Sequence, residues 1–403
     1  MLGRDRLGLG ARLGGALLRI GADRALETCG AALPRSEAQL ARAETLESLL
    51  RRYGLEPLPP VRRVALPGIG FESSNCQNFL VEIEWGDARA SDRLPPASLY
   101  VKLPCRELGT RAFANAVGFW AVECAFAKRL ADQVPIRVPR VYAVAERGAR
   151  FVLLLENLRE DPSVRLFDNR DMAAGTSIER ARRCLECFAE LHAAFWDGDA
   201  ARRDALLPRS LHTYLAPGAR ARTRALNAAA IDPARRAAAD LFGEAHAALC
   251  RRAVAKWDAL VDAWYRDPLT LIHGDSHLAN CFEYRHQGAV RVGMLDFQGC
   301  HWGHGIRDVQ YFLINSLEPE LLAEHEAELI DHYLAALARH GISLDSSEAQ
   351  ERYRAYAFQT LMVAVVSLGL GSLTERETTL RTVLARSVAA VDRLDFGTWL
   401  DAL

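Results

Sequence analysis

Hydrophobic and polar positions change their spacing along the chain, and this change divides it into a strand-rich part and a helical part. Between residues 61 and 155, short apolar runs alternate with polar turns, as expected for β-strands. The predicted strands span Val61–Leu66, Asn78–Trp85, Ser98–Leu103, Val141–Ala145 and Phe151–Leu155. After residue 156 the apolar residues recur every three or four positions, which is typical of helices that bury one face. The predicted helices span Ser177–Trp196, most of Arg202–Asp267, Glu320–His340, Ser347–Leu370 and Glu375–Leu394.

Two further helices are predicted before residue 156. Ser36–Tyr53 carries leucines among charged residues, and Ala112–Val134 has the pattern of one long helix. The first 35 residues are rich in glycine and arginine, and their apolar patch at Leu13–Leu18 is too short for a secretory core. We predict a poorly ordered or short helical extension over 1–35, with an organellar transit segment as the alternative. A strand-rich unit over 36–156 and a helical unit over 157–403 would follow.

The composition is typical of a soluble globular protein. Of 403 residues, half are apolar and a quarter are charged, and the formal net charge is −1. A nearly neutral chain has no overall field that would attract nucleic acid or an anionic membrane. The longest apolar run, Leu361–Leu373, is shorter than the roughly 18 residues of a membrane span, so it is predicted to be a buried helix. We therefore expect neither a nucleic-acid nor a membrane partner.

The nine cysteines are scattered along the chain without the spacing of a disulfide framework. An odd number in a chain of this length favours reduced thiols and a cytoplasmic location. Cys184 and Cys187 form a single C-x-x-C pair inside a helical pattern. Because no second pair accompanies them, buried thiols on a helix face are favoured over a zinc or redox site.

The candidate chemistry lies in His273–Asn280, which reads His-Gly-Asp-Ser-His-Leu-Ala-Asn, and in the Leu-Asp-Phe-Gln run that begins at Leu295. Apolar runs flank the two motifs, and a polar turn at residues 285–288 predicts a hairpin between them. Such a hairpin would bring Asp275, Asn280 and Asp296 to one end. The first carboxylate could orient and deprotonate an attacking hydroxyl, and the other two side chains suit magnesium. The pattern therefore predicts a phosphotransferase.

These motifs resemble the catalytic core of the aminoglycoside phosphotransferase and choline kinase superfamily, the small-molecule relatives of protein kinases. The superfamily's HGDxxxxN motif matches His273–Asn280, and its second metal-binding aspartate matches Asp296. The Asp-Phe-Gln form, with Gly303 and Asp308–Leu313, is most similar to the ecdysteroid kinase-like branch. The resemblance implies an α+β, two-lobed protein kinase-like fold, with a small antiparallel-sheet N-lobe containing one long helix and a large, mainly helical C-lobe. It also implies ATP and Mg²⁺ as cofactors, bound between the lobes, and a small-molecule hydroxyl acceptor.

Lys102 and Glu123 are predicted to form an ion pair. Lys102 interrupts an apolar strand pattern, and Glu123 lies among apolar residues of the helix predicted to follow. A buried glutamate is costly unless it is paired, and Lys102 is the natural partner, with Glu107 as a competitor. An exposed lysine on a strand edge is the alternative. The resemblance implies that the pair holds Lys102 on the nucleotide phosphates.

The resemblance implies further contacts to the nucleotide. The turn that follows the first predicted strand would cover the phosphates, and Ser73 and Ser74 would supply donors there in place of additional glycines. The segment 153–158 is similar to the hinge between the lobes of these kinases. The backbone of Glu156 and Leu158 would therefore bind the adenine.

Several other residues are predicted to be structural. His273 would hold the catalytic loop by hydrogen bonds, and His192 is expected to be a satisfied core histidine. Asp308 would cap the helix predicted over Val309–Ser316 or, as the resemblance implies, brace the catalytic loop. The stretch from Asp296 to Asp308 is too short for the activation segment of a protein kinase, which favours a small-molecule acceptor.

Two other functions stay open. His273, Asp275 and His277, with His301 and His304 nearby in sequence, could form the metal site of a hydrolase. That hypothesis leaves Asn280, the Asp-Phe-Gln segment, Lys102 and Glu123 unexplained. The second alternative is a catalytically silent, nucleotide-binding pseudokinase that regulates a partner.

The acceptor and the oligomeric state are not determined by the sequence. An acidic run between Glu318 and Asp331 could attract a cationic acceptor such as an aminoglycoside or choline. Its i, i+4 spacing also suits an ordinary solvated helix face. Sugar, amino-alcohol and steroid-like acceptors all stay possible.

Overall fold

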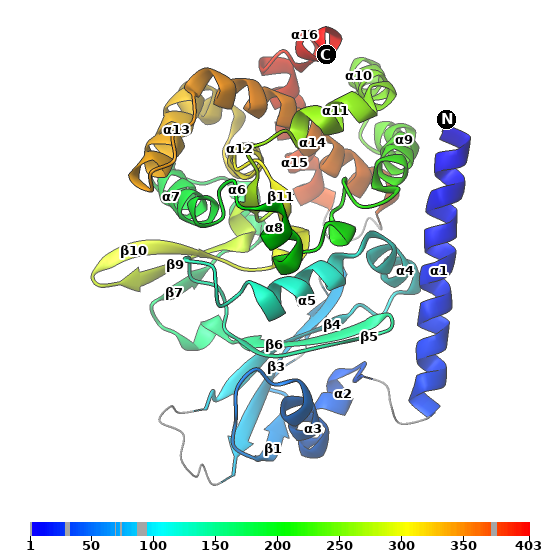
Figure 1. The fold of residues 1–403 in the computed structure, drawn as a ribbon, viewed down its shortest axis with the longest axis vertical. Coiled ribbons are helices and arrows are strands. Elements are labelled where there is room, and N and C mark those ends of the chain that lie inside the picture. Colours follow the sequence, from blue (N-terminus) through cyan, green and yellow to red (C-terminus); the bar gives the residue numbers. More distant parts are fainter. Residues whose placement is uncertain (1, 29–32, 69, 73–74, 87–94, 372–376) are drawn as a thin grey trace. The chain divides into compact units, whose positions relative to one another are not determined.

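The computed structural model describes residues 2–28, 33–68, 70–72, 75–86, 95–371 and 377–403 (Figure 1). The chain divides into two compact units. One, here called the sheet unit, comprises Gly10–Gln133 and Val138–Pro162. The other, the helical unit, comprises Met1–Leu9, Val134–Arg137 and Ser163–Leu403.

The sheet unit is built on an antiparallel sheet with the strand order β1-β3-β4-β6-β5, with β2 paired to β3. Its strands are β1 (Val61–Ala65), β2 (Phe71–Glu72), β3 (Cys76–Trp85), β4 (Ser98–Pro104), β5 (Val141–Arg147) and β6 (Arg150–Glu156). The five strands predicted in this part of the sequence are thereby confirmed. Strand β4 lies between β3 and β6, with Lys102 opposite Asn78 on one side and Leu153 on the other.

Helices cover both faces of this sheet. They are α2 (Glu37–Leu40), α3 (Ala43–Tyr53), α4 (Leu108–Val117) and α5 (Phe119–Arg129). Leu99, Val101 and Leu103 of β4 belong to the apolar cluster that α3 completes. Because successive side chains of a strand alternate between its faces, Lys102 lies on the opposite face. That is the face that α5 covers through Trp120 and Cys124.

The single long helix predicted over Ala112–Val134 is wrong. The structure has two helices there, α4 and α5, which meet at Gly118. Gly118 has a φ of 88°, in the left-handed region that glycine adopts without steric cost. The glycine in the middle of the helical pattern was the signal for this break.

The N-terminal segment also differs from the prediction of a poorly ordered or short helical extension over 1–35. The structure has one 27-residue helix, α1 (Leu2–Thr28). Ala16 and Ile20 of this helix are buried against Ala112 and Ala116 of α4. Tertiary packing therefore supports a helix that its many glycines would weaken in isolation.

The helical unit is dominated by helices, with two small sheets. The helices are α6 (Asn169–Ala174), α7 (Ile178–Ala194), α8 (Ala200–Leu206), α9 (Ala219–Ala237), α10 (Glu244–Ala255), α11 (Trp257–Trp264), α12 (Ile306–Ser316), α13 (Pro319–Arg339), α14 (Ser346–Leu370), α15 (Glu377–Arg393) and α16 (Phe396–Ala402). The strands are β7 (Val164–Leu166), β8 (Thr270–Ile272), β9 (Cys281–His286), β10 (Ala289–Met294) and β11 (His301–Gly303). They form a three-stranded sheet, β10-β9-β7, and a two-stranded sheet, β11-β8.

Helix α12 lies at the centre of the helical unit, and every one of its residues is buried. A helix that is buried all round is a core element, and α14 packs beside it. By length and composition α14 could also cross a membrane, but 67% of its most apolar window is buried inside the protein. The predicted α+β plan, with an antiparallel-sheet N-terminal unit and a mainly helical C-terminal unit, is confirmed.

Candidate active site

The loop between β8 and β9 carries Asp275 and Asn280, and the β9–β10 hairpin leads back to Asp296. The hairpin pairs Cys281 with Met294 in register. One step further, the Leu295 amide donates to the Asn280 carbonyl over 3.0 Å. Asn280 and Asp296 therefore lie at the same end of the hairpin, as the sequence predicts.

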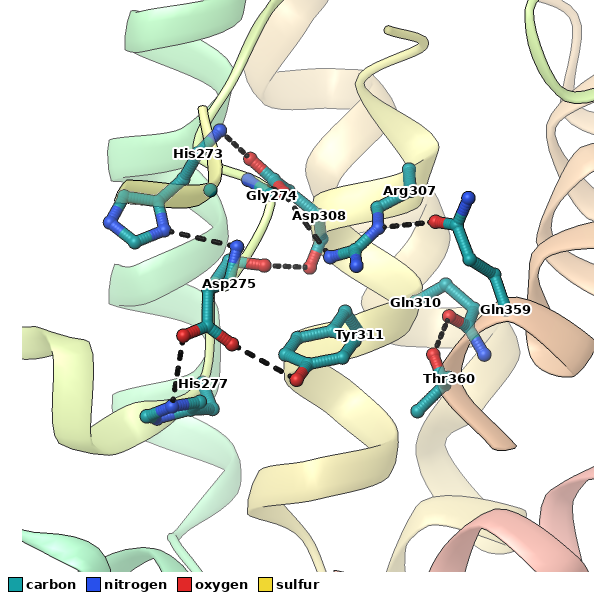
Figure 2. Close-up of polar contacts among 12 residues, drawn as sticks. His273, Gly274, Asp275, His277, Arg307, Asp308, Gln310, Tyr311, Gln359 and Thr360 are labelled. Atoms are coloured by element: carbon teal, nitrogen blue, oxygen red, sulfur yellow. Dashed lines mark hydrogen bonds and ion pairs between the residues drawn. The ribbon is translucent and has the colours of Figure 1, made fainter. Parts of the chain in front are cut away.

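The carboxylate of Asp275 is held by donors on both oxygens, and Figure 2 shows the one from Tyr311. Its Oδ1 accepts a hydrogen bond from the Tyr311 hydroxyl over 3.0 Å, and its Oδ2 accepts one from Asn280 Nδ2 over 3.2 Å. His277 Nε2 lies 3.7 Å from the same Oδ2. The Asp275 side chain is 29% exposed, so it is both fixed and accessible. Such an arrangement suits a group that orients a reactant.

Asn280 and Asp296 have the chemistry expected of magnesium ligands. Asn280 Nδ2 donates to the Asp275 carbonyl and carboxylate, which fixes the amide so that its Oδ1 is the remaining polar atom. No residue in the described part of the chain donates a hydrogen bond to that oxygen. Asp296 adopts φ 66° and ψ 63°, a left-handed conformation that aspartate tolerates better than most residues. Amide and carboxylate oxygens are hard ligands, so the two residues present fit Mg²⁺.

The loop between β8 and β9 needs a glycine at position 274. Gly274 has a φ of 78°, and an added Cβ would lie 2.0 Å from the carbonyl oxygen of Gly299. Both the backbone conformation and the space exclude a side chain. The glycine of the HGD motif thus lets the loop pass close to the backbone of Gly299, next to Asp275.

His273 ties the loop to the segment before Asp296. Its Nδ1 accepts from the Asp275 amide over 3.2 Å, and its Nε2 lies 3.0 Å from the Leu295 carbonyl. These contacts define a neutral ring with the proton on Nε2. Complete burial lowers the pKa of His273 below its usual value, which favours that neutral form. The predicted structural role of His273 is confirmed.

Helix α12 braces the loop between β8 and β9 through Asp308. The carboxylate of Asp308 accepts from the amides of His273 and Gly274, over 2.6 and 2.9 Å. Its backbone carbonyl accepts from the Ser276 hydroxyl over 2.9 Å. The helix begins at Ile306, so the predicted N-cap role of Asp308 is wrong. Its bracing role is confirmed.

A histidine completes the surroundings of Asp308. His192 Nε2 lies 3.3 Å from Asp308 Oδ2, and its Nδ1 lies 2.9 Å from the Tyr333 hydroxyl. His192 is therefore the satisfied core histidine that the sequence predicts. Burial alone would raise the pKa of Asp308, but the His192 hydrogen bond and the Arg307 charge lower it below its usual value. Asp308 is thus held as a carboxylate.

In the sheet unit, Lys102 and Glu123 form the predicted ion pair. Lys102 Nζ lies 2.5 Å from Glu123 Oε1, and each side chain is only 5% exposed. The competing partner, Glu107, instead caps α4 by accepting from the amides of Gly109 and Thr110. The hydrogen bonds from Thr110 and Gly109 lower the pKa of Glu107. The phosphate-binding role of Lys102 stays a prediction.

The structure describes only some of the other residues predicted to contact the nucleotide. The Glu156 amide donates to the Arg140 carbonyl over 2.8 Å, so that amide is not available to an adenine. Leu158 opens the short 3-10 helix η1 (Leu158–Glu160), and no acceptor for its amide is found in the described ranges. Leu158 is therefore the better candidate for a backbone donor. Ser73 and Ser74 lie outside the described residues.

In the described part of the chain, the residues of the alternative hydrolase site are not gathered as a metal-binding group. Besides the contacts of His273, His301 uses Nδ1 toward the Gly299 carbonyl and Nε2 toward the Tyr265 hydroxyl. His304 Nδ1 accepts from the Ile306 amide. Among the residues that the structure describes, no group of three His, Cys, Asp or Glu side chains could hold a metal ion. His273, His301 and His304 thus use ring nitrogens in contacts with backbone groups and with the Tyr265 hydroxyl.

The eight cysteines in the described ranges are buried and form no disulfide there. They include Cys184 and Cys187, which lie on α7 with their side chains in the core. Burial raises the pKa of Cys187 well above its usual value. The prediction of buried helix-face thiols for this C-x-x-C pair is confirmed.

Two residues of the site carry no sequence prediction: Tyr311, which contacts Asp275, and Arg307, which contacts the Tyr311 ring. Tyr311 follows Asp308 by three positions on a helix, so the two side chains lie on the same side of α12. This i, i+3 spacing within the Asp308–Leu313 motif could have identified Tyr311. Nothing in the sequence pattern distinguishes Arg307 from an ordinary surface arginine.

Comparison with solved structures shows distant similarity to small-molecule kinases. A candidate aminoglycoside phosphotransferase from Ralstonia eutropha shares 17% identity over 89% of this chain and 98% of its own, with a TM-score of 0.48. An ethanolamine kinase from Plasmodium vivax shares 13% over 78% of each chain, with a TM-score of 0.48. The choline kinase LicA from Streptococcus pneumoniae shares 13% over 89% of this chain and 99% of its own, with a TM-score of 0.45.

No curated protein matches this sequence. The model of the ecdysteroid kinase-like family, in contrast, matches residues 125–346, which is more than half of the chain. The matched range contains the loop between β8 and β9, the β9–β10 hairpin and the bracing helix α12. The chain belongs to the ecdysteroid kinase-like family.

Proposed function

We propose that this protein is an ATP- and Mg²⁺-dependent phosphotransferase that phosphorylates a hydroxyl group of a small molecule in the cytoplasm. One observation carries the proposal. The Asp275 carboxylate and the Asn280 amide are held in one hydrogen-bonded arrangement at the end of a hairpin, and Asp296 follows on the other strand. Membership of a kinase-like family supports the same chemistry.

Asp275 would orient the acceptor hydroxyl. Each of its oxygens accepts one hydrogen bond from the protein and has room for another, because a carboxylate oxygen offers about two acceptor sites. The hydroxyl of the acceptor would donate to one of them. In a loose phosphoryl-transfer transition state little proton removal is needed early, so most of the effect of Asp275 would come from positioning.

Asn280 and Asp296 would hold the magnesium ion. When bound, Mg²⁺ would offset the negative charge of the nucleotide phosphates. Asn280 Oδ1 is pre-oriented for this role because Nδ2 of the same amide is tied to Asp275. The protein thus fixes the amide before any ion arrives.

Lys102 is the proposed contact to the phosphates in the sheet unit. Its ammonium group is buried and held by Glu123 at 2.5 Å. Removing either partner would leave an uncompensated buried charge, so the pair fixes the position of the lysine. Leu158, through its amide, is the proposed contact to the adenine.

Phosphorus-31 NMR of MgATP with a panel of hydroxyl compounds tests the proposal. The panel contains an amino alcohol, a sugar, an aminoglycoside and a steroid alcohol. We expect ADP and a new phosphomonoester resonance with at least one of them, absent when Asp275→Asn replaces the wild type. If MgATP binds but no compound in a broad panel is phosphorylated, the pseudokinase alternative gains the support that the transferase loses.

A further inference from the structure

Tyr311 donates directly to the residue proposed to orient the acceptor. Its hydroxyl lies 3.0 Å from Asp275 Oδ1, whereas His277 lies next to the other oxygen, with its ring 6.4 Å from the Tyr311 ring (Figure 2). Tyr311 is 4% exposed. A buried phenol needs a hydrogen-bond partner, and here the partner is the carboxylate itself.

The Tyr311 ring is held in place by a buried cation. The guanidinium carbon of Arg307 lies 4.2 Å from the ring centroid, within the range of a cation–π contact. Arg307 Nε donates to Gln359 Oε1 over 2.7 Å, and Nη1 lies 3.8 Å from Asp308 Oδ1. The ring therefore has few alternative positions, and its hydroxyl is aimed at Asp275.

The hydroxyl is a permanent donor. Burial raises the pKa of Tyr311 well above its usual value, and the negative charge of Asp275 raises it further. A phenol in this environment keeps its proton and cannot act as a base. Toward Asp275 it acts as a hydrogen-bond donor that orients the carboxylate.

The contact from Tyr311 completes a series along α12. Asp308 holds the amides of His273 and Gly274, Tyr311 holds the side chain of Asp275, and the Ser316 hydroxyl accepts from the Leu278 amide over 3.0 Å. Of these contacts, the one from Tyr311 reaches the Asp275 side chain, whereas the others hold the loop backbone. Loss of the Tyr311 hydroxyl would thus leave the loop in place and release one carboxylate oxygen.

We propose that Tyr311 is a positioning residue for phosphoryl transfer, whose hydroxyl fixes one oxygen of Asp275 while Asn280 fixes the other. This inference rests on the proposed function. It adds that α12 sets the orientation of the acceptor-binding carboxylate as well as the fold of the loop. Because the ring contact with Arg307 does not need the hydroxyl, Tyr311→Phe removes the positioning bond alone.

Steady-state turnover of MgATP with water as the acceptor tests this role without a known substrate. We expect Tyr311→Phe to lower kcat by roughly ten- to a hundredfold, the effect of a poorly oriented catalytic group, with the KM for MgATP within about twofold of wild type. The matched control is Tyr356→Phe, because Tyr356 is equally buried and donates to the Trp264 carbonyl. We expect its kcat to stay near wild type.

A double variant separates positioning from a general effect on folding. If Tyr311 acts through Asp275, adding Tyr311→Phe to Asp275→Asn causes no further fall in kcat. Equal kcat values for Tyr311→Phe and Tyr356→Phe, or a further fall in the double variant, would overturn the inference. A wild-type protein that neither binds nor turns over MgATP would overturn the proposed function itself, and this role of Tyr311 with it.

Discussion

Asp275→Asn is expected to reduce phosphoryl transfer from MgATP by roughly a thousandfold, with MgATP binding changed by less than about threefold. Asparagine has nearly the shape of aspartate, so its side-chain oxygen can still accept from Tyr311 or Asn280. The substitution removes the negative charge that would orient and deprotonate the acceptor hydroxyl. The measurement is the rate of ADP formation, together with calorimetric titration of MgATP.

The matched control is Asp345→Asn. Asp345 caps α14 on the surface by accepting from the Glu348 amide over 3.0 Å, and asparagine is an equally good cap. This variant should keep the wild-type rate. Near-normal turnover in Asp275→Asn would mean that another group orients the acceptor, and the proposed mechanism would be wrong.

Asp308→Asn is expected to destabilise the protein by about 3–5 kcal/mol, the usual cost of breaking a buried charged network. Both carboxylate oxygens of Asp308 accept from backbone amides, those of His273 and Gly274. An asparagine side chain has only one oxygen, so its NH₂ group would face one of these N–H donors. The mismatch arises inside a fully buried site, where no water can relieve it. Urea unfolding followed by circular dichroism measures the loss.

The same variant should change how stability depends on pH. The pKa of Asp308 is lower in the folded protein than the value of about 3.9 in an unfolded chain. The carboxylate therefore contributes its full stabilisation above about pH 4 and loses it as the pH falls further. We expect the stability gap between wild type and Asp308→Asn to narrow as the pH falls from about 4 toward the lower folded-state pKa of Asp308. Asp345→Asn serves again as the control. If Asp308→Asn lowers the free energy of unfolding no more than Asp345→Asn does, the bracing role of Asp308 would be contradicted.

Local motifs predicted much of the fold and the candidate site. The β-strands of the sheet unit, the helical C-terminal unit, the Lys102–Glu123 pair and the meeting of Asn280 with Asp296 all follow from short-range patterns. A charged residue in an apolar run needs a partner, and a hairpin register brings its two ends together. Both rules depend on a few neighbouring residues, so a sequence can reveal them.

What the sequence could not show depends on tertiary packing. The weak, glycine-rich pattern of α1 becomes a long helix only because Ala16 and Ile20 pack against α4. Arg307 gives no signal in the sequence, because its role depends on tertiary contacts. The Tyr311 ring on α12 and the Gln359 side chain on α14 hold it in place. The sequence predicts an N-cap role for Asp308, but α12 begins two residues earlier, at Ile306, because its first turn is held by packing in the core.

Thermal unfolding with ATP, with Mg²⁺ and with both tests the central claim most directly, because it needs no acceptor. For the wild type we predict a clear rise of the Tm that requires ATP and Mg²⁺ together, since a ligand stabilises the state that binds it. Asp296→Ala should lose most of that rise, whereas Asp345→Asn should keep it. An unchanged Tm in all conditions, or an equal rise in Asp296→Ala, would contradict the assignment of a nucleotide and magnesium site to these residues.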